Sequence, residues 1–475
     1  MEQKGSTQMA KAQVLVEVTT GVQEAGFEAF SAATSSEVSA YDQIADALEP
    51  TAGLGVEPDE SLAPVPMFGI MKDQYEMPDA ISEFSEPTTN PDLPASTVVV
   101  PVELSRSKIE ELRGRDGVVG VWPNSRQYLL RDVWPEISGD EVESSVFDMA
   151  RSRIGIDSRP FRPAVSIDVI RELLGVLLPW RDGFRGQNVA VGIIDEGING
   201  TAYPVSGGFA RVGSSRQPGS ASVTSHGSMC AADVLVAAPA ARLYDYPFLG
   251  VPNSGGALKM FQAVLEQRRI DGTPHITTNS YGFTGVPDIT QQPGHEIHDL
   301  NHPLHRKVRE VVASGAAAFF AAGNCGEPCP SGNCHPSGIG PGRSIHASNS
   351  LAETITIAAV NSRLERIGYS AQGPGMFEQQ KPDFAAFSHF FGNFGPGRPG
   401  GTTEGPFDSG TSAATPVAAG AAALLLSAFP ELTPSELRTA LLSGLVNTTG
   451  SPWDPGYGCG ILNVAASYWI LQHKR

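Results

Sequence analysis

The sequence predicts an α/β fold: a doubly wound, mostly parallel sheet with helices on both faces, preceded by a small α+β domain of ferredoxin-like type. Two observations lead to this prediction. In the second half of the 475-residue chain, nearly continuous apolar strands alternate with helical segments, which is typical of a parallel sheet buried on both faces. Glycine and proline are frequent, with 52 and 37 residues, and follow no repeat period. They indicate many tight turns and argue against a coiled coil or collagen.

The first 100 residues are strongly acidic. They contain 17 acidic side chains, three lysines and no arginine. Their net charge is −14, whereas the remaining 375 residues carry only −4. Neither part has the basic face that nucleic-acid binding requires, and no apolar run reaches the roughly 20 residues of a membrane span. We therefore expect no nucleic-acid partner and no membrane crossing.

An N-terminal domain is expected at residues 1–130, with disorder at about 30–60 and 73–95. Its strands are recognised by β-branched, alternating sequences; they are Gln13–Thr19, Pro64–Met71, Ser96–Leu104 and Val118–Trp122. A short helix is expected between the last two strands, and an earlier helix has no clear marker. This order predicts a small β-α-β-β-α-β domain.

Residues 131–180 are expected to be a linker with an N-terminal helix, and residues 181–475 the main domain. Its expected strands are Val189–Ile194, Arg242–Tyr246, His275–Tyr281, Ala316–Ala322 and Thr354–Val360. Its expected helices are Gly227–Leu235, Gly256–Arg269, Pro303–Ala313, Ala413–Ala428 and Pro434–Leu445. Ligands of such sheets bind at the carboxyl ends of the strands, so polar residues at these ends are candidate site residues.

Four polar residues stand at positions of this kind. Asp195 ends an apolar strand and Asn324 follows another, whereas His226 and Ser412 open helices. Each of them alone has a structural explanation as a turn residue or a helix cap. Together they supply an orienting carboxylate, an oxyanion donor, a general base and a nucleophile. Ser412 is the strongest local signal, because the positive end of the apolar helix behind it favours a developing oxyanion.

Three ordered motifs contain these residues. They are Ile-Ile-Asp-x-Gly at 193–197, His-Gly-Ser at 226–228 and Gly-Thr-Ser-x-Ala-x-Pro at 410–416. With these motifs, and with a spacing of 31 residues from Asp195 to His226, residues from about 175 to 470 resemble the subtilisin-like serine proteases, the subtilases. The resemblance implies the subtilisin-like fold and a serine endopeptidase that cleaves through an acyl-enzyme.

The resemblance also implies a role for each residue. Ser412 would be the nucleophile, His226 its general base and Asp195 the carboxylate that orients the imidazole. Asn324 and the backbone N–H of Ser412 would bind the oxyanion. Two segments resemble the strands that line the substrate in this family, and they supply the expected substrate-binding residues Ser280, Tyr281, Gly282, Ala321, Ala322 and Gly323.

The N-terminal domain resembles a subtilase propeptide in its last strand–helix–strand unit, residues 96–130. Such a domain would be an intramolecular inhibitor, and the enzyme would be made as a zymogen. We expect its tail, around Asn124–Leu130, to lie through the active site and self-cleavage to occur near Leu130. The expected partners are therefore a protein or peptide substrate and the chain's own N-terminal domain. An unrelated ferredoxin-like domain is the alternative.

Three cysteines, Cys325, Cys329 and Cys334, lie in one loop. They could be free thiols, contain one disulfide, or bind zinc, and zinc is the least expected because the loop has no second Cys-x-x-Cys half. We expect no required cofactor; calcium is common in the family, but no acidic loop marks a site. Met1–Thr20 has no apolar stretch of signal-peptide length, and five cysteines cannot all pair. A cytoplasmic location is therefore expected.

Two alternative functions use the same fold. One is a catalytically silent binding protein with its N-terminal domain permanently docked, against which the complete set of four site residues argues. The other is a peptide ligase or macrocyclase, which product masses would distinguish from a hydrolase. Glu196 follows Asp195 where the family more often has a small residue or Asp. It would either favour basic residues near the cleaved bond or simply face solvent.

Overall fold

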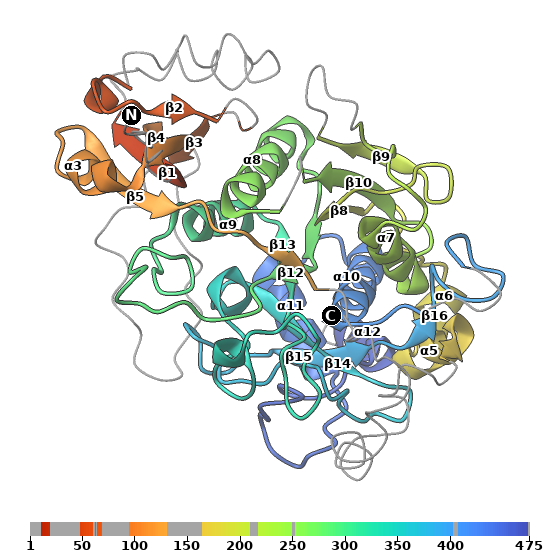
Figure 1. Cartoon of the computed structure of the whole chain (residues 1–475). Coiled ribbons are helices and arrows are strands. Elements are labelled where there is room, and N and C mark those ends of the chain that lie inside the picture. The colour runs from red at the N-terminus through yellow and green to blue at the C-terminus, as the bar shows by residue number, and fades with distance from the viewer. Residues whose placement is uncertain are drawn as a thin grey trace.

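The computed structural model describes residues 11–19, 48–59, 62, 64–68, 95–130, 164–209, 217–248, 252–401 and 407–473. Figure 1 shows a small N-terminal unit beside a larger one, with the extended segment after β5 leading from the first into the second.

The larger unit is built on a seven-stranded sheet in the order β15-β14-β13-β11-β8-β10-β9. All of its neighbouring strands are parallel. The strands are β8 Ala190–Asp195, β9 Val205–Gly208, β10 Arg242–Pro247, β11 Ile276–Asn279, β13 Ala317–Ala321, β14 Ile355–Val360 and β15 Phe384–Phe387. The predicted doubly wound α/β fold is confirmed.

Both faces of this sheet are buried. Successive side chains of a strand point to opposite faces, and on each face they join an apolar cluster. In β8, Val191 and Ile193 belong to one apolar cluster and Ala190 and Ile194 to another. The first cluster lies under α5 Ile167–Leu174, α7 His226–Ala237, α10 Thr411–Ala428, α11 Pro434–Ser443 and α12 Val464–His473. The second lies under α8 Ser254–Asp271 and α9 Pro303–Ala313. This is why β8, β13, β14 and β15 are almost wholly apolar.

Helix α10 passes through the core. Among the described residues it is the one helix with the length and hydropathy of a membrane span, and 89% of its apolar window is buried inside the protein. It packs on α7 and against β11, β13, β14 and β15. Helix α10, which begins at the Ser412 motif, and helix α7, which begins at the His226 motif, are therefore held side by side.

Several elements differ from the prediction. The expected strand His275–Tyr281 divides, because the chain leaves the sheet after Asn279 and forms β12 Tyr281–Gly282 in a separate two-stranded sheet. The expected N-terminal helix divides at Gly175 into α5 and α6 Leu177–Arg181. Strands β9 and β15 are four residues each and were not predicted.

The N-terminal unit is a five-stranded antiparallel sheet with one helix among its described residues. Its elements are β1 Lys11–Thr19, β2 Glu57–Pro58, β3 Val65–Phe68, β4 Ala95–Ser105, α3 Ile109–Arg113 and β5 Val118–Pro123, with short 3-10 helices at Glu49–Thr51 and Arg106–Lys108. Of the stretch 30–60 that is expected to be disordered, the structure describes residues 48–59. The expected first helix, the rest of that stretch and 73–94 lie outside the described residues.

One face of the N-terminal sheet packs against the larger unit. Alternate residues of its strands, Leu15, Val65, Met67 and Val99, share an apolar cluster with α8 and α9. At the edges of this contact, the buried Glu17 pairs with Arg306 of α9, and the indole Nε1 of Trp122 donates to Asp299 Oδ2 at 2.8 Å. Figure 1 shows the unit seated on these two helices.

Candidate active site

The ends of three secondary-structure elements meet at the site: the carboxyl end of β8 and the amino ends of α7 and α10. They carry Asp195, His226 and Ser412 respectively. All three side chains are almost completely buried. Gly227 lets the start of α7 approach the end of β8, since a Cβ at this position would lie 2.4 Å from the Gly197 carbonyl oxygen. The glycine beside the histidine is therefore required by packing.

Asp195 and His226 form a close pair. The imidazole Nδ1 lies 2.9 and 2.8 Å from the two carboxylate oxygens of Asp195. The backbone N–H of Glu196 donates to Asp195 Oδ1 at 2.8 Å and fixes the carboxylate. The Nε2 of His226 is buried and has no hydrogen-bond partner among the described residues. With Nδ1 bonded to a carboxylate, the neutral imidazole keeps Nε2 as a proton acceptor.

Glu196 has a local structural role. Its carboxylate accepts a hydrogen bond from the backbone N–H of His226, the first residue of α7. An acid at this place satisfies an N–H group that the helix leaves without an intrahelical partner. This contact gives the unusual acid after Asp195 a structural role, and an effect of Glu196 on substrate choice stays a prediction.

Ser412 is the second residue of α10. Its hydroxyl donates to the carbonyl oxygen of Leu130 at 2.7 Å rather than to His226. Cys230, one helical turn after His226, has its Sγ 3.9 Å from the imidazole Nδ1 and 3.7 Å from the Ser412 carbonyl oxygen. The thiol thus packs between α7 and α10, and burial raises its pKa well above the usual value.

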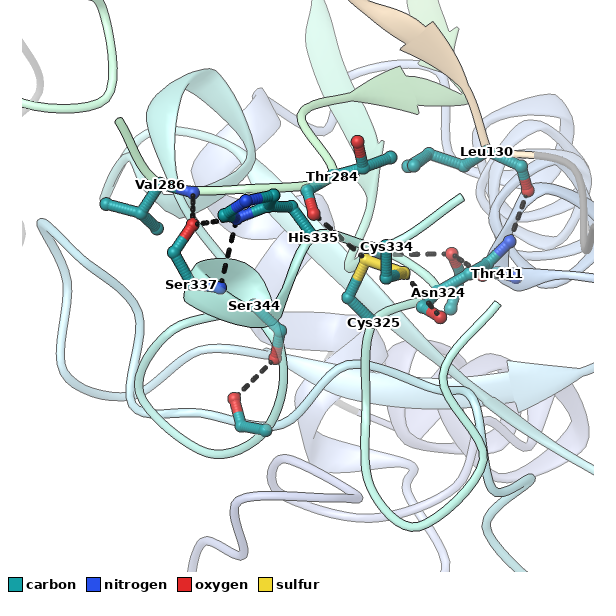
Figure 2. The surroundings of a disulfide bond; sticks show 12 residues. Leu130, Thr284, Val286, Asn324, Cys325, Cys334, His335, Ser337, Ser344 and Thr411 are labelled. Carbon is teal, nitrogen blue, oxygen red and sulfur yellow. Dashed lines mark hydrogen bonds between the residues drawn. A yellow bond between two sulfur atoms is a disulfide. The ribbon is translucent and has the colours of Figure 1, made fainter. Parts of the chain in front are cut away.

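Asn324 follows β13 and faces the same carbonyl oxygen. Its Nδ2 donates to Leu130 O at 2.5 Å, and Figure 2 shows the two groups pointing at each other. Its Oδ1 accepts from both the N–H and the hydroxyl of Thr411, each at 2.9 Å. Thr411, a residue that sequence reasoning did not single out, therefore fixes which end of the amide faces Leu130.

The conformation and surroundings of Gly410 explain why the Gly-Thr-Ser motif begins with glycine. Its φ is 84°, a left-handed conformation that favours glycine. A Cβ here would lie 2.7 Å from Leu130 O and 3.0 Å from Asn324 Nδ2. Only glycine leaves room for the carbonyl group that both side chains contact.

The segment that ends at Leu130 lies in the site as an added strand. Tyr128–Leu129 (β6) pairs antiparallel with β12, and the N–H of Leu130 donates to Ser280 O at 3.0 Å. On the other side of the segment, the N–H of Gln127 donates to Pro252 O at 2.9 Å. The segment thus forms main-chain hydrogen bonds to both neighbours, with the Leu130 carbonyl beside Ser412.

The expected substrate-binding residues contribute mainly backbone. Ser280 and Gly282 border the added strand through main-chain atoms. The ring of Tyr281 points into the core and packs edge-on against Phe248 with 5.0 Å between ring centroids. Ala321, Ala322 and Gly323 lie buried at the end of β13. Their backbone groups are taken by partners within the larger unit, the side chains of Asn349 and Thr411 and the Ile357 carbonyl.

The cysteine loop contains one disulfide, between Cys325 and Cys334, so these two sulfurs cannot be zinc ligands. Cys329 is not part of it. The disulfide begins directly after Asn324, and the sulfur of Cys334 lies 3.5 Å from the Asn324 carbonyl oxygen (Figure 2). Among the described residues, only Asp195, His226 and Cys230 bring three potential metal ligands together, and their mutual contacts explain this grouping without an ion.

A pair of aspartates, which was not predicted from the sequence, lies between α7 and the segment before α10. Asp233 of α7 and Asp408, just before Gly410, are both fully buried. Asp408 accepts N–H groups of Asn393 and Phe394 at 2.6 and 2.8 Å, whereas neither oxygen of Asp233 has a donor among the described residues. Burial raises the pKa of Asp408 to about 6 and that of Asp233 well above the usual range. Burial thus favours the protonated form of both carboxyls.

Comparisons with known proteins agree with this geometry. The model of the Subtilase family matches residues 186–460. Subtilisin DY of Bacillus licheniformis is 30% identical over 294 residues, which cover 60% of this chain and 92% of that protein. Subtilisin E of Bacillus subtilis is 31% identical over 297 residues, which cover 60% of this chain and 67% of that protein.

The likeness in structure extends further along the chain. The crystal structure of fervidolysin from Fervidobacterium pennivorans, a keratinolytic enzyme related to subtilisin, aligns with a TM-score of 0.56 at 16% identity. The alignment covers 98% of this chain and 62% of that one, and it concerns the fold.

The expected cytoplasmic location is wrong, because the subtilisins and fervidolysin are secreted or extracellular proteases. The prediction depended on the composition of the first residues and on an odd number of cysteines, and neither observation tests the compartment directly. The Cys325–Cys334 disulfide is in keeping with an oxidising environment. The matched family model and the identity to the subtilisins show that the chain belongs to the subtilase family of serine endopeptidases.

Proposed function

We propose that Ser412, His226 and Asp195 are the catalytic triad of this protease, and that the chain is made as a zymogen inhibited by its own N-terminal unit. One observation carries the proposal: the Leu130 carbonyl oxygen accepts hydrogen bonds from both Asn324 Nδ2 and Ser412 Oγ, at 2.5 and 2.7 Å. A peptide carbonyl held by a nucleophile and an amide donor is in the position of a scissile bond.

The proposed reaction begins when Ser412 Oγ attacks the carbonyl carbon of the bound peptide. Its proton moves to His226 Nε2, which is buried and has no other partner in the described part of the chain. Asp195 holds Nδ1–H and stabilises the imidazolium that forms. The oxyanion is bound by Asn324 Nδ2 and the backbone N–H of Ser412. His226 then protonates the leaving amine, and water hydrolyses the acyl-enzyme by the reverse sequence of proton transfers.

In this reaction the serine hydroxyl must turn from one partner to another. In the structure it donates to the Leu130 oxygen, and its bond to His226 forms only when that carbonyl is attacked or has left. Catalytic hydrogen bonds are often absent before the reactive complex forms. The contact with Leu130 therefore represents the inhibited state of the enzyme in this proposal.

The inhibitory role of residues 11–130 is supported by how the tail binds. The tail also covers the amino end of α8, where Gly255 N–H donates to the Asn124 side chain at 2.8 Å and Ser254 N–H to the Ser125 carbonyl at 2.9 Å. Added to the apolar contact with α8 and α9, these bonds would keep the N-terminal unit docked after the chain is cut. We propose self-cleavage after Leu130.

The enclosed Leu130 also indicates the substrate. This side chain is only 2% exposed, so the subsite before the cleaved bond accepts an apolar residue of leucine size. The proposed activity is endopeptidase cleavage of extended protein segments after apolar residues. The proposed chemistry needs no metal or organic cofactor.

The test compares wild type with Ser412→Ala and His226→Ala. A fluorophosphonate probe should label wild type at Ser412 once the cut N-terminal unit has been separated from the enzyme, and neither variant should be labelled. A peptide with Tyr-Leu-Leu before the cleaved bond should be hydrolysed by wild type alone. Equal hydrolysis by Ser412→Ala would contradict the proposed triad.

A further inference from the structure

The added strand places one residue of the tail in a buried polar subsite. Leu130 precedes the bond next to Ser412, so Gln127 is the fourth residue before that bond. Its backbone is fixed by the bond from its N–H to Pro252 O at 2.9 Å. Its side chain is only 2% exposed and points at Glu296.

The partner of Gln127 is a carboxyl group in the interior. Glu296 is 1% exposed, and its Oε1 accepts from Gln127 Nε2 at 3.0 Å. The other oxygen, Oε2, accepts from the hydroxyl of Ser254, the first residue of α8, at 2.5 Å. Ser254 belongs to the enzyme and stays in place when the tail leaves. The Oε1 atom is therefore the part of the subsite that an incoming peptide must satisfy.

The subsite uses only the donor end of the glutamine. The carbonyl oxygen of the same amide, Gln127 Oε1, is buried and has no hydrogen-bond partner among the described residues. Recognition of a whole amide would need a donor for this oxygen. A side chain that offers only N–H groups, such as lysine or arginine, would bury no unpaired acceptor.

We infer that Glu296 is a specificity-determining residue that selects a hydrogen-bond-donating side chain, glutamine or a basic residue, at the fourth position before the cleaved bond. This inference rests on the proposed function, because it takes Leu130 as the residue before that bond. Two physical costs support it. An apolar side chain would leave a buried Glu296 oxygen without a donor, and an acidic one would bring two carboxyls together in the interior.

The state of Glu296 agrees with this role. Burial raises its pKa to about 7, and the hydrogen bonds from Ser254 and Gln127 oppose that rise. Both of these donors are neutral groups. A cationic side chain in the subsite would supply the opposite charge that a buried carboxylate needs.

The first arm of the test needs no catalysis. In full-length protein carrying Ser412→Ala, hydrogen–deuterium exchange of the segment 124–130 measures how often the tail leaves the site. Gln127→Leu should raise this exchange about tenfold or more, whereas Gln127→Lys should not. The effect of Gln127→Leu should disappear when Glu296→Leu is also present. Arg126→Leu is the matched control, because the Arg126 side chain is exposed, and its effect should not depend on Glu296.

The second arm measures substrate choice of the self-processed enzyme after the cut N-terminal unit has been separated from it. Peptides X-Tyr-Leu-Leu-p-nitroanilide are compared with Gln, Lys, Leu or Glu as X. Wild type should favour Gln and Lys over Leu by about tenfold or more in kcat/KM, and Glu296→Leu should reverse this order. A Ser412-dependent cleavage that ignores X would overturn the inference and leave the proposed function intact.

The remaining outcomes are also decisive. If no peptide is cleaved in a Ser412-dependent way while exchange still couples residues 127 and 296, the proposed function fails and Glu296 only holds the tail. If exchange shows no coupling between these two positions, the buried contact selects nothing and the inference is wrong. Glu296→Gln keeps the shape of the site and serves as the folded reference in both arms.

Discussion

The buried pair of Asp233 and Asp408 should make the stability of this protein fall as pH rises through the weakly acidic range. Neither oxygen of Asp233 has a donor among the residues that the structure describes, and burial, followed by the nearby charge of Asp408, raises its pKa well above 3.8. The folded protein therefore binds a proton at Asp233 that the unfolded chain releases above about pH 4. Stability must then decrease with increasing pH.

Asp233→Asn removes this proton uptake and keeps a donor toward Asp408. Each pH unit between the unfolded and folded pKa of Asp233 costs wild type about 1.36 kcal/mol. As pH rises above 4, wild type should therefore lose stability relative to the variant by this amount for each pH unit below the folded pKa. For a domain of this size, that corresponds to about 2–5 °C in Tm for each pH unit. At pH 4 the two proteins should differ little.

The assay is calorimetric Tm between pH 4 and pH 7, in a Ser412→Ala background that prevents self-digestion. Asp168→Asn is the control, because the Asp168 side chain is 81% exposed and its replacement should change stability by less than about 0.5 kcal/mol. Parallel pH profiles for wild type and Asp233→Asn would refute the raised pKa of Asp233. A variant less stable than wild type at pH 7 would do the same, since it would mean that the Asp233 charge is compensated.

Three further predictions concern the site and the N-terminal unit. Asn324→Ala should reduce kcat about 10²–10³-fold with little change in KM, which is the loss known for the corresponding donor of subtilisin. An unchanged kcat would contradict the proposed role of Asn324 as an oxyanion donor. Replacing both Cys325 and Cys334 by serine should lower the free energy of unfolding by about 2–3 kcal/mol, because the disulfide closes a short loop with a sequence separation of 9. An unchanged midpoint of denaturation would contradict this prediction. Arg306→Met leaves Glu17 buried without its cation and should weaken inhibition by the separated N-terminal unit about tenfold or more, whereas Arg363→Met, at an exposed pair, should not change the inhibition constant.

Local motifs made much of the fold and the site predictable. The alternation of apolar strands and helices predicted the parallel sheet, because burial on both faces leaves a continuous apolar pattern. Asp195, His226, Ser412 and Asn324 could be singled out because each lies at a strand end or a helix start, where the topology of a parallel sheet gathers polar groups.

Contacts between distant segments were not predictable in the same way. The pairing of Gln127 with Glu296 joins residues 169 positions apart, and neither has a motif around it. Thr411 and Asp233 also act through tertiary contacts, although Thr411 lies inside a motif. The disulfide stayed open because three cysteines in one loop allow several pairings, and only the folded loop brings Cys325 and Cys334 together.

The short strands were not predicted for another reason. Strands β9 and β15 contain four residues each, and neither has the β-branched, alternating sequence that marks a strand. The residues after Asn279 pair with the tail in a separate sheet, a contact between distant segments that the sequence of the strand does not show. The helix after Ile167 divides where Gly175 takes a left-handed conformation.

The central claim is that Ser412 cuts the chain after Leu130. Intact mass of freshly purified wild type and Ser412→Ala, each held at neutral pH over time, tests it most directly. Wild type should separate into two fragments whose masses place the cut between residues 130 and 131, and Ser412→Ala should stay whole. If both proteins stay whole, or if both are cut at that bond, Ser412 does not process the tail and the account is wrong.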